Sequence, residues 1–102
     1  MIHVIATITC TPGKREAFLA EFRKIVPLVL QERGCLAYAP TVDCAVALAV
    51  PTAARADIAV IVEQWQDVAC LKAHQVAPHM NAYRIRVKDF VQSVAVQVLD
   101  PV

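Results

Sequence analysis

Apolar and polar residues alternate with a period of two over two stretches, which is the pattern of β-strands. The first stretch covers residues 2–10, and its apolar face consists of Ile2, Val4, Ala6, Ile8 and Cys10. The second covers residues 90–99, near the end of the chain. A third strand is predicted over residues 58–65, which are apolar on both faces for most of their length. Both faces of this third strand should therefore be covered by other parts of the protein.

A helical spacing of apolar residues follows the first strand, with a stripe formed by Phe18, Phe22, Ile25, Val26 and Val29. We expect Thr11 to cap this helix and Pro12 to be its first residue. Pro27 removes one backbone donor, so it should kink the helix or restart it as a second short piece. Gly34 stands where a left-handed residue would end the helix.

The remaining segments predict one more strand and two short helices. Residues 35–42 have strand character, and Pro40 confines this strand to the edge of a sheet or bends it. Residues 45–50 could extend a strand, whereas residues 51–57 should form a loop. Asp67 is placed to cap a helix over about residues 68–76, and Pro78 opens another that ends near residue 88.

The predicted order of elements is strand, helix, strand, strand, helix, strand. This is the split βαβ, or ferredoxin-like, plan: an α+β fold with an antiparallel sheet and helices on one face. Such a sheet leaves its other face bare. Because the third strand is apolar on both faces, we expect two sheets to pack face to face and form a barrel-like dimer.

The composition is more apolar than one small domain needs. With 102 residues, the chain should be a single domain, residues 1–102. Apolar and aromatic residues make up 58% of it, against about 45–50% in a typical globular domain. A domain of this size removes only roughly two-thirds of its unfolded surface from water. We therefore expect a homodimer interface, the alternative being a core rich in Ala and Val.

The distribution of charges and cysteines excludes several classes of partner. The net charge is +1, and Glu16, Glu21 and Glu32 are interleaved with the basic residues of the first helical segment. This pattern is typical of a solvated helix face, so nucleic-acid binding is not expected. No apolar run approaches the roughly 18 residues of a membrane span, and the start of the chain lacks signal-peptide character. The four cysteines form no C-x-x-C pair, so we expect reduced thiols and a cytoplasmic protein.

Three short motifs follow one another along the chain. They are G-C-x-x-Y at residues 34–38, E-x-W at residues 63–65 and H-x-x-x-P-H at residues 74–79. In this order and spacing, the chain resembles the antibiotic biosynthesis monooxygenase family over nearly its whole length. It departs from the family at Pro40 and at residues 43–57, which are longer and more apolar than the usual turn.

The resemblance implies a dimeric α+β barrel with a pocket between sheet and helices in each subunit. Known enzymes of the family oxidise quinols, anthrones and related aromatics with O2, often without metal or flavin. A small aromatic substrate, O2 as co-substrate and no cofactor are therefore implied. Removal of a phenolic proton makes an anion that can pass an electron to O2, so such an enzyme needs a base, a dry pocket and hydrogen-bond donors.

His74 and Glu63 are the predicted catalytic residues. His74 shares a helix turn with Leu71 and should face inward, where it could act as a base or orient the substrate oxygen. The alternative is a partly buried histidine bonded to the backbone. Glu63 shares a strand face with Trp65, where an unpaired carboxylate is costly to bury. Glu63 could instead be structural, paired with an Arg or bonded to His74.

Five further residues are predicted to contact the substrate: Trp65, His79, Tyr38, Phe18 and Phe22. Trp65 could be a wall on which an aromatic ring stacks, or plain core. Tyr38 could face the pocket or an interface, and the two phenylalanines belong to the apolar stripe of the first helix. Pro78 lies between His74 and His79, so their convergence stays open. As a metal pair they lack a fixed third ligand, so no metal site is predicted.

Three other functions are weighed against this interpretation. The haem-degrading branch of the fold uses an Asn on the first strand, a Trp on the helix after the third strand and a His ten residues further on. The first strand here has no Asn, and the other two positions hold His74 and Arg84, so haem cleavage is disfavoured. A non-oxidative isomerase or signal-molecule-degrading enzyme could use His74 and Glu63 for enolisation. A non-catalytic ligand-binding dimer is the remaining alternative.

Overall fold

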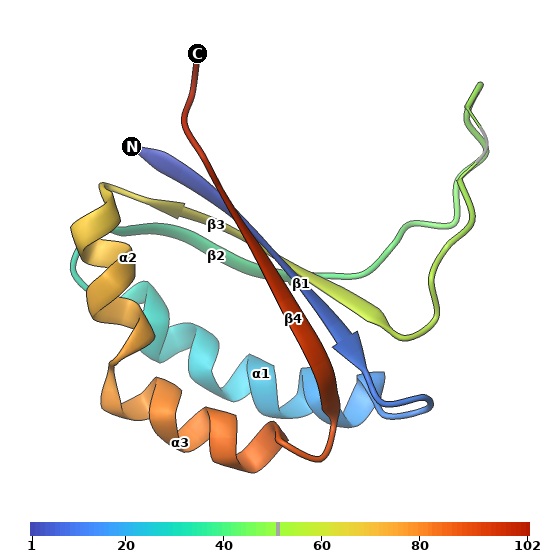
Figure 1. Ribbon diagram of the computed structural model, residues 1–102, viewed down its shortest axis with the longest axis horizontal. Coiled ribbons are helices and arrows are strands. Elements are labelled where there is room, and N and C mark those ends of the chain that lie inside the picture. Colours follow the sequence, from blue (N-terminus) through green and yellow to red (C-terminus); the bar gives the residue numbers. More distant parts are fainter. Residues whose placement is uncertain (51) are drawn as a thin grey trace.

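A computed structural model describes residues 1–50 and 52–102, and Pro51, part of the loop predicted at 51–57, lies outside them. The described residues form four strands and three helices (Figure 1). In chain order these are β1 (Ile2–Cys10), α1 (Arg15–Leu30), β2 (Cys35–Thr41), β3 (Ile58–Trp65), α2 (Val68–Gln75), α3 (Pro78–Val87) and β4 (Val91–Leu99).

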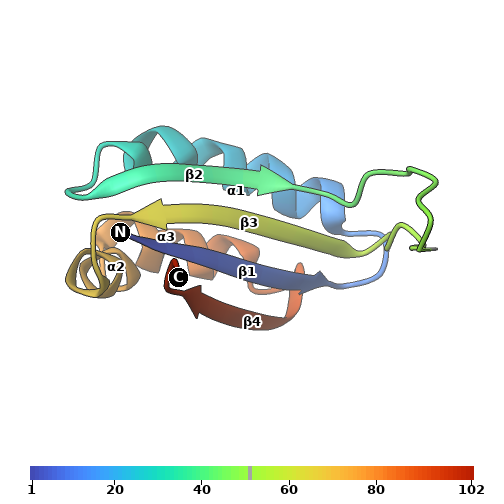
Figure 2. The same cartoon turned by 90° about the horizontal axis from the view of Figure 1, so that it is seen from above.

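The strands form one antiparallel sheet in the order β2-β3-β1-β4, which Figure 2 shows side by side. All the helices lie on one side of this sheet (Figure 1). The predicted ferredoxin-like α+β fold is therefore confirmed. β2 lies at an edge, as Pro40 predicted, because proline has no N–H to donate to a further strand.

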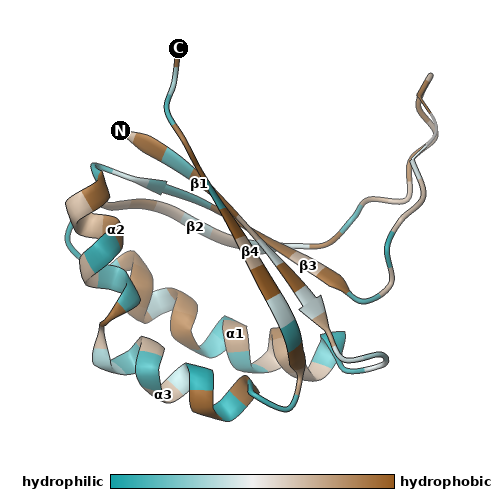
Figure 3. Cartoon of the chain, in the orientation of Figure 1, coloured by the Kyte–Doolittle hydropathy of each residue, from teal (hydrophilic) through white to brown (hydrophobic). Residues whose placement is uncertain are grey.

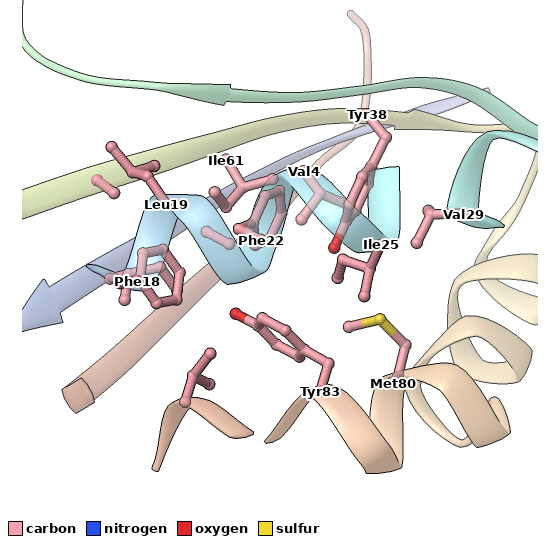
Figure 4. Close-up of a cluster of buried hydrophobic side chains, with 14 of the residues drawn as sticks. Val4, Phe18, Leu19, Phe22, Ile25, Val29, Tyr38, Ile61, Met80 and Tyr83 are labelled. Carbon is pink, nitrogen blue, oxygen red and sulfur yellow. The ribbon is translucent and has the colours of Figure 1, made fainter. Parts of the chain in front are cut away.

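Alternation along the strands determines which side chains reach the core. On β1, every second residue from Ile2 to Cys10 is buried, and these residues face the helices. The register pairs Val4 with Glu63 and Ile2 with Trp65, so alternate residues of β3 share the same face. The helices complete the core with buried side chains, several of which Figure 4 shows, namely Phe18, Leu19, Phe22, Ile25 and Val29 of α1, Leu71 of α2, and Met80, Tyr83 and Val87 of α3.

The predicted start of the first helix was wrong. Thr11 and Pro12 belong to a tight turn, in which the Lys14 N–H donates to the Thr11 carbonyl at 2.9 Å. Gly13 has φ = +78° in this turn, and Pro followed by a left-handed Gly is the sequence that a type II turn requires. The helix begins only at Arg15, after the turn is complete.

Pro27 does not divide α1, so of the two predicted outcomes, a kink or a second short helix, the second does not occur. The helix runs unbroken from Arg15 to Leu30 with Pro27 inside it. Pro27 is exposed, whereas Ile25 and Val29 on the inner face are buried. Water can therefore solvate the carbonyl that proline leaves without a donor, while packing holds the inner face in place.

Gly34 is left-handed as predicted, with φ = +78°, but it does not end the helix. α1 ends at Leu30 with Gln31 as its cap, and Gly34 lies in the following turn before β2. A Cβ at Gly34 would lie 2.4 Å from the Sγ of Cys70. The absence of a side chain therefore lets α2 approach this turn closely.

Residues 42–50 and 52–57 form an arm that extends away from the body of the protein (Figure 1). The strand extension predicted at residues 45–50 is not formed, and β2 ends at Thr41 instead of residue 42. At the base of the arm, the Arg55 guanidinium and Asp43 carboxylate make two hydrogen bonds of 2.7 and 3.0 Å. Side-chain pairing at the base thus joins the two ends of the arm in place of a strand ladder.

The sheet face opposite the helices has an apolar patch that is bare within one chain. Ile5, Val60, Val62, Ala37 and Ala39 lie on this face, and Val62 is 38% exposed. Apolar residues run along the strands in Figure 3. In residues 1–50 and 52–102, no helix or strand covers this face, so one chain alone does not meet the expectation that both faces of β3 are covered. None of the helices described has the length and apolar character that crossing a bilayer requires.

Candidate active site

A cavity of about 420 Å³ lies between the sheet and the helices α2 and α3. Its walls are largely apolar and include Val4, Ala6 and Ile61 from the sheet and Phe22 and Met80 from the helices. Val94 and Val96 of β4 also line the cavity, and they stay about half exposed. The cavity is therefore open along β4, and its size is within the range of small-molecule sites.

His74 reaches this cavity because Asp67 fixes the start of α2. The Asp67 carboxylate accepts the Cys70 N–H at 2.9 Å, and from this cap the helix turns Leu71 and His74 inward. The His74 ring packs against Trp65 and Tyr38, with ring centroids 4.8 and 5.3 Å away. Burial lowers the pKa of His74 below its usual value, although Glu32 opposes this shift. His74 is therefore neutral near neutral pH.

Glu32 connects His74 with His79. One Glu32 carboxylate oxygen lies 2.9 Å from Nδ1 of His74 and 2.7 Å from Nε2 of His79. An ionised carboxylate only accepts hydrogen bonds, so in this arrangement Nδ1 of His74 carries the proton. Nε2 of His74 then keeps its lone pair and is the basic atom of the ring.

Sequence reasoning missed Glu32 as a site residue. It was assigned to the solvated face of the first helix, but α1 ends before it and its side chain is only 14% exposed. The turn that follows α1 directs Glu32 toward α2 and α3. Its position two residues before the G-C motif was the only local signal, and that spacing does not reveal a partner 42 residues away.

Glu63 is a buried carboxyl group, 5% exposed, in the wall of the cavity. Its Oε1 accepts the indole N–H of Trp65 at 2.8 Å. Burial raises the pKa of Glu63 from 4.5 to about 7, although the bond from Trp65 acts in the opposite direction. Among the described residues of one chain, Glu63 makes no hydrogen bond to an Arg or to His74. Trp65 lies two residues further along the same face of β3, so its indole N–H is within reach and supplies the hydrogen bond that the buried carboxyl group needs.

The other predicted site residues divide into two groups. Tyr38 and Phe22 line the cavity and stack on each other with ring centroids 5.3 Å apart. Phe18 and Trp65 are completely buried and do not line it, because other side chains cover them. A ligand in this cavity therefore has no open indole face on which to stack. His79 lies on Glu32 instead of in the cavity wall, so the two histidines converge on a carboxylate.

Two tyrosines are the neutral donors of the cavity. Tyr38 comes from β2 and Tyr83 from α3, and both point into the space between sheet and helices (Figure 4). Burial raises the pKa of both phenols far above the usual value, so both keep their protons. Among the described residues, no group of three His, Cys, Asp or Glu side chains is placed to hold a metal ion.

A neutral imidazole and a carboxyl group with a pKa near neutrality face one apolar cavity. Groups of this kind are suited to acid-base catalysis on a small, largely apolar molecule. The fold and the cavity therefore define the class of protein as a small α+β protein with an acid-base site between sheet and helices.

Comparison with known proteins assigns the family. The family model described as "Antibiotic biosynthesis monooxygenase" matches residues 1–86. The chain is 46% identical to "Probable quinol monooxygenase YgiN" of Escherichia coli K12, over 99% of this chain and 98% of that protein. The chain belongs to the antibiotic biosynthesis monooxygenase family and is an enzyme of the monooxygenase class.

Solved structures of similar proteins share the fold over almost the entire chain. PA3566 from Pseudomonas aeruginosa is 30% identical with a TM-score of 0.82, over 99% of this chain and 93% of that one. Rv0793 from Mycobacterium tuberculosis is 25% identical with a TM-score of 0.80, over 99% of this chain and 94% of that one. The arrangement of strands and helices around the cavity is therefore common to these proteins.

We expect Glu32→Ala to let the His74 ring adopt either of its two neutral tautomers. In the wild type, nitrogen-15 NMR should show Nδ1 of His74 protonated and Nε2 unprotonated, since Glu32 accepts from Nδ1. The variant should show a mixture of tautomers and a lower His74 pKa, because Glu32 favours the charged ring. Glu16→Ala, at an exposed position of α1, is the control and should change neither. An unchanged His74 spectrum in Glu32→Ala would contradict the geometry.

Glu63 should make the stability of the protein fall as pH rises from about 5 to about 8. Its folded-state pKa is about 7 against an ordinary 4.5. The native state therefore holds a proton in this window that the unfolded chain has released. Relative to Glu63→Gln, the wild type should lose about 2–3 kcal/mol of unfolding free energy across the window. Urea denaturation at both ends of the pH range measures this. A constant difference between the two proteins would show that Glu63 titrates normally.

Proposed function

We propose that this protein is a cofactor-independent monooxygenase that oxidises a small hydroquinone- or anthrone-like aromatic with O2. The observation that carries the proposal is the pair of His74 and Glu63 in the wall of one apolar cavity. The printed name of the Escherichia coli relative, a probable quinol monooxygenase, supports the same substrate class. The cavity volume of about 420 Å³ suits an aromatic molecule of two or three rings.

The chemistry needs no reductant other than the substrate. One oxygen atom of O2 enters the ring system and the other leaves as water, so a hydroquinone becomes a hydroxyquinone and an anthrone becomes an anthraquinone. In both cases the substrate supplies the electrons. The protein has to remove a proton from the substrate, because the resulting anion passes an electron to O2 far more readily than the neutral molecule does.

His74 is the proposed base, acting through the lone pair on Nε2. Glu32 holds Nδ1 at 2.9 Å and would stabilise the imidazolium that forms. Glu63, with a pKa near 7, can accept or return a second proton at neutral pH. Tyr38 and Tyr83 keep their protons and can donate hydrogen bonds to the developing oxyanion.

The remaining predicted residues have supporting roles in the proposal. Trp65 packs behind His74 and donates to Glu63, so it positions both groups without reaching the substrate. His79 holds Glu32 from the far side at 2.7 Å. Phe22 forms cavity wall, and Phe18 supports it from the core with ring centroids 5.8 Å apart.

Oxygen uptake by metal-stripped protein tests the proposed reaction. With a panel of hydroquinones and anthrones, we expect uptake by the wild type and a loss of at least about 100-fold in His74→Ala, the usual scale for removing a general base. Glu16→Ala changes an exposed residue of α1 that does not line the cavity, so it should keep full activity. Absence of uptake by the wild type with every compound would rule out the oxygenase, and equal uptake by His74→Ala would remove His74 as its base.

The proposal includes a homodimer in which the bare sheet faces pack together. Ile5, Val60 and Val62 lie on this face and are only partly covered within one chain. Exposing an apolar patch of this kind to water is unfavourable, and a second copy presents the same complementary patch. A cytoplasmic location is also proposed, because the four cysteines are free thiols, as is usual in a reducing compartment.

We expect Val62→Lys to convert the dimer to a monomer, since it places a charge in the middle of the bare face. Light scattering after size-exclusion chromatography would measure the mass of the wild type and of the variant. Ile85→Lys, at a 72% exposed position of α3, is the matched control and should stay dimeric. A monomeric wild type, or a dimer that tolerates Val62→Lys, would show that this face is not the interface.

A further inference from the structure

We infer that Arg84 and Lys88 bind a carboxylate on the substrate, at the end away from the oxygen that His74 deprotonates. This inference rests on the proposed function, because it narrows the substrate class to aromatic compounds that carry an acidic substituent. The two cations line the cavity, lack acidic partners and lie at a distance from His79 that an aromatic molecule can span.

Arg84 and Lys88 both line the cavity, although both are exposed. They are four residues apart on α3 and its C-terminal cap, so they share one face of the helix. Met80, one turn earlier on the same face, is buried in the cavity wall. The inner wall of α3 is thus apolar, and its flank at the mouth of the cavity carries two positive charges.

Neither cation is neutralised by the protein. Arg84 donates to the Asn81 side chain at 3.1 Å, a neutral group that orients the guanidinium and leaves other N–H groups free. In residues 1–50 and 52–102, no carboxylate lies within ion-pair distance of Arg84 or Lys88. By contrast Arg86, between them in sequence, pairs with Glu21 at 3.2 Å. Two unpaired cations beside an apolar cavity attract an anion to its mouth.

The helix dipole does not account for this arrangement. Basic residues in the last turn of a helix are favoured by the negative end of its dipole, and Arg84 and Arg86 both belong to that class. The dipole acts equally on side chains that point in any direction around the helix. It therefore explains why α3 ends with basic residues, but not why Arg84 and Lys88 border the cavity.

The positions also determine the length of the molecule that would fit. His74 and Glu32 lie beside His79 at the start of α3, whereas Lys88 caps its end. With a rise of about 1.5 Å per residue, Arg84 and Lys88 lie roughly 8 and 14 Å further along the helix axis than His79. An aromatic system of two or three fused rings, with a hydroxyl group at one end and a carboxylate at the other, spans the shorter distance.

Calorimetric binding of two inert probes to the full-length protein tests the inference without any turnover. The probes are 6-hydroxy-2-naphthoate and its neutral counterpart 6-hydroxy-2-naphthamide, which differ only in the charge at one end. We expect the wild type to bind the carboxylate about fivefold to tenfold more tightly than the amide. This preference should shrink in about 0.5 M salt, because exposed charges are screened.

The double variant Arg84→Gln with Lys88→Gln should bind both probes with the affinity that the wild type has for the amide. Arg86→Gln removes a neighbouring cation that does not line the cavity and should keep the preference. Equal binding of the two probes by the wild type would overturn the inference, as would an undiminished preference in the double variant. Either result would leave the oxygen-uptake test of the proposed function intact. Binding of neither probe would overturn the inference and also count against an aromatic substrate.

Discussion

The side chain of Trp65 connects the sheet to the candidate active site. Trp65 is the last residue of β3, where it pairs in register with Ile2 of β1 and Cys35 of β2. Its side chain is completely buried. Its N–H is bonded to Glu63 at 2.8 Å, and its ring packs against His74 of α2. The indole of Trp65 therefore donates a hydrogen bond to the buried carboxyl group of Glu63 and also limits how closely the His74 ring approaches the sheet. The positions of both titratable groups therefore depend on Trp65, and Tyr38 of β2 packs against the His74 ring as well.

Burial, more than pairing, sets the protonation states in the cavity. Desolvation raises the pKa of Glu63 and of both tyrosines and lowers that of His74, so every one of these groups is shifted toward its neutral form. The carboxylate of Glu32 lies beside this cavity wall, within hydrogen-bond distance of both histidines. Apart from Glu32 and the two cations at its mouth, the site therefore has little charge at rest. The charge that develops during a reaction is then felt strongly, since apolar walls screen it poorly.

Membership of the family fixes the fold, but the substrate depends on details that similar proteins do not have to share. In this protein two such details border the cavity, namely the two cations on the flank of α3 and the opening along β4. The arm extends from the end of β2 and the start of β3, away from α2 and α3 (Figure 1). The cavity lies between the sheet and these two helices. Substrate choice is therefore expected to depend on α3 and β4.

The sequence alone determined what depends on short-range periodicity. Alternation located β1, β3 and β4 within one residue, Asp67 and Pro78 marked the starts of α2 and α3, and Pro40 placed β2 at an edge. The inward direction of His74 followed from helical spacing. Tertiary structure alone decided the partner of Glu63, the burial of Trp65 behind His74 and the bridge from Glu32 to two histidines. It also decided that α1 starts after a turn and continues through Pro27. Local pattern reports which face a residue occupies, whereas contacts between residues far apart in sequence exist only once the sheet register and the helix packing bring them together.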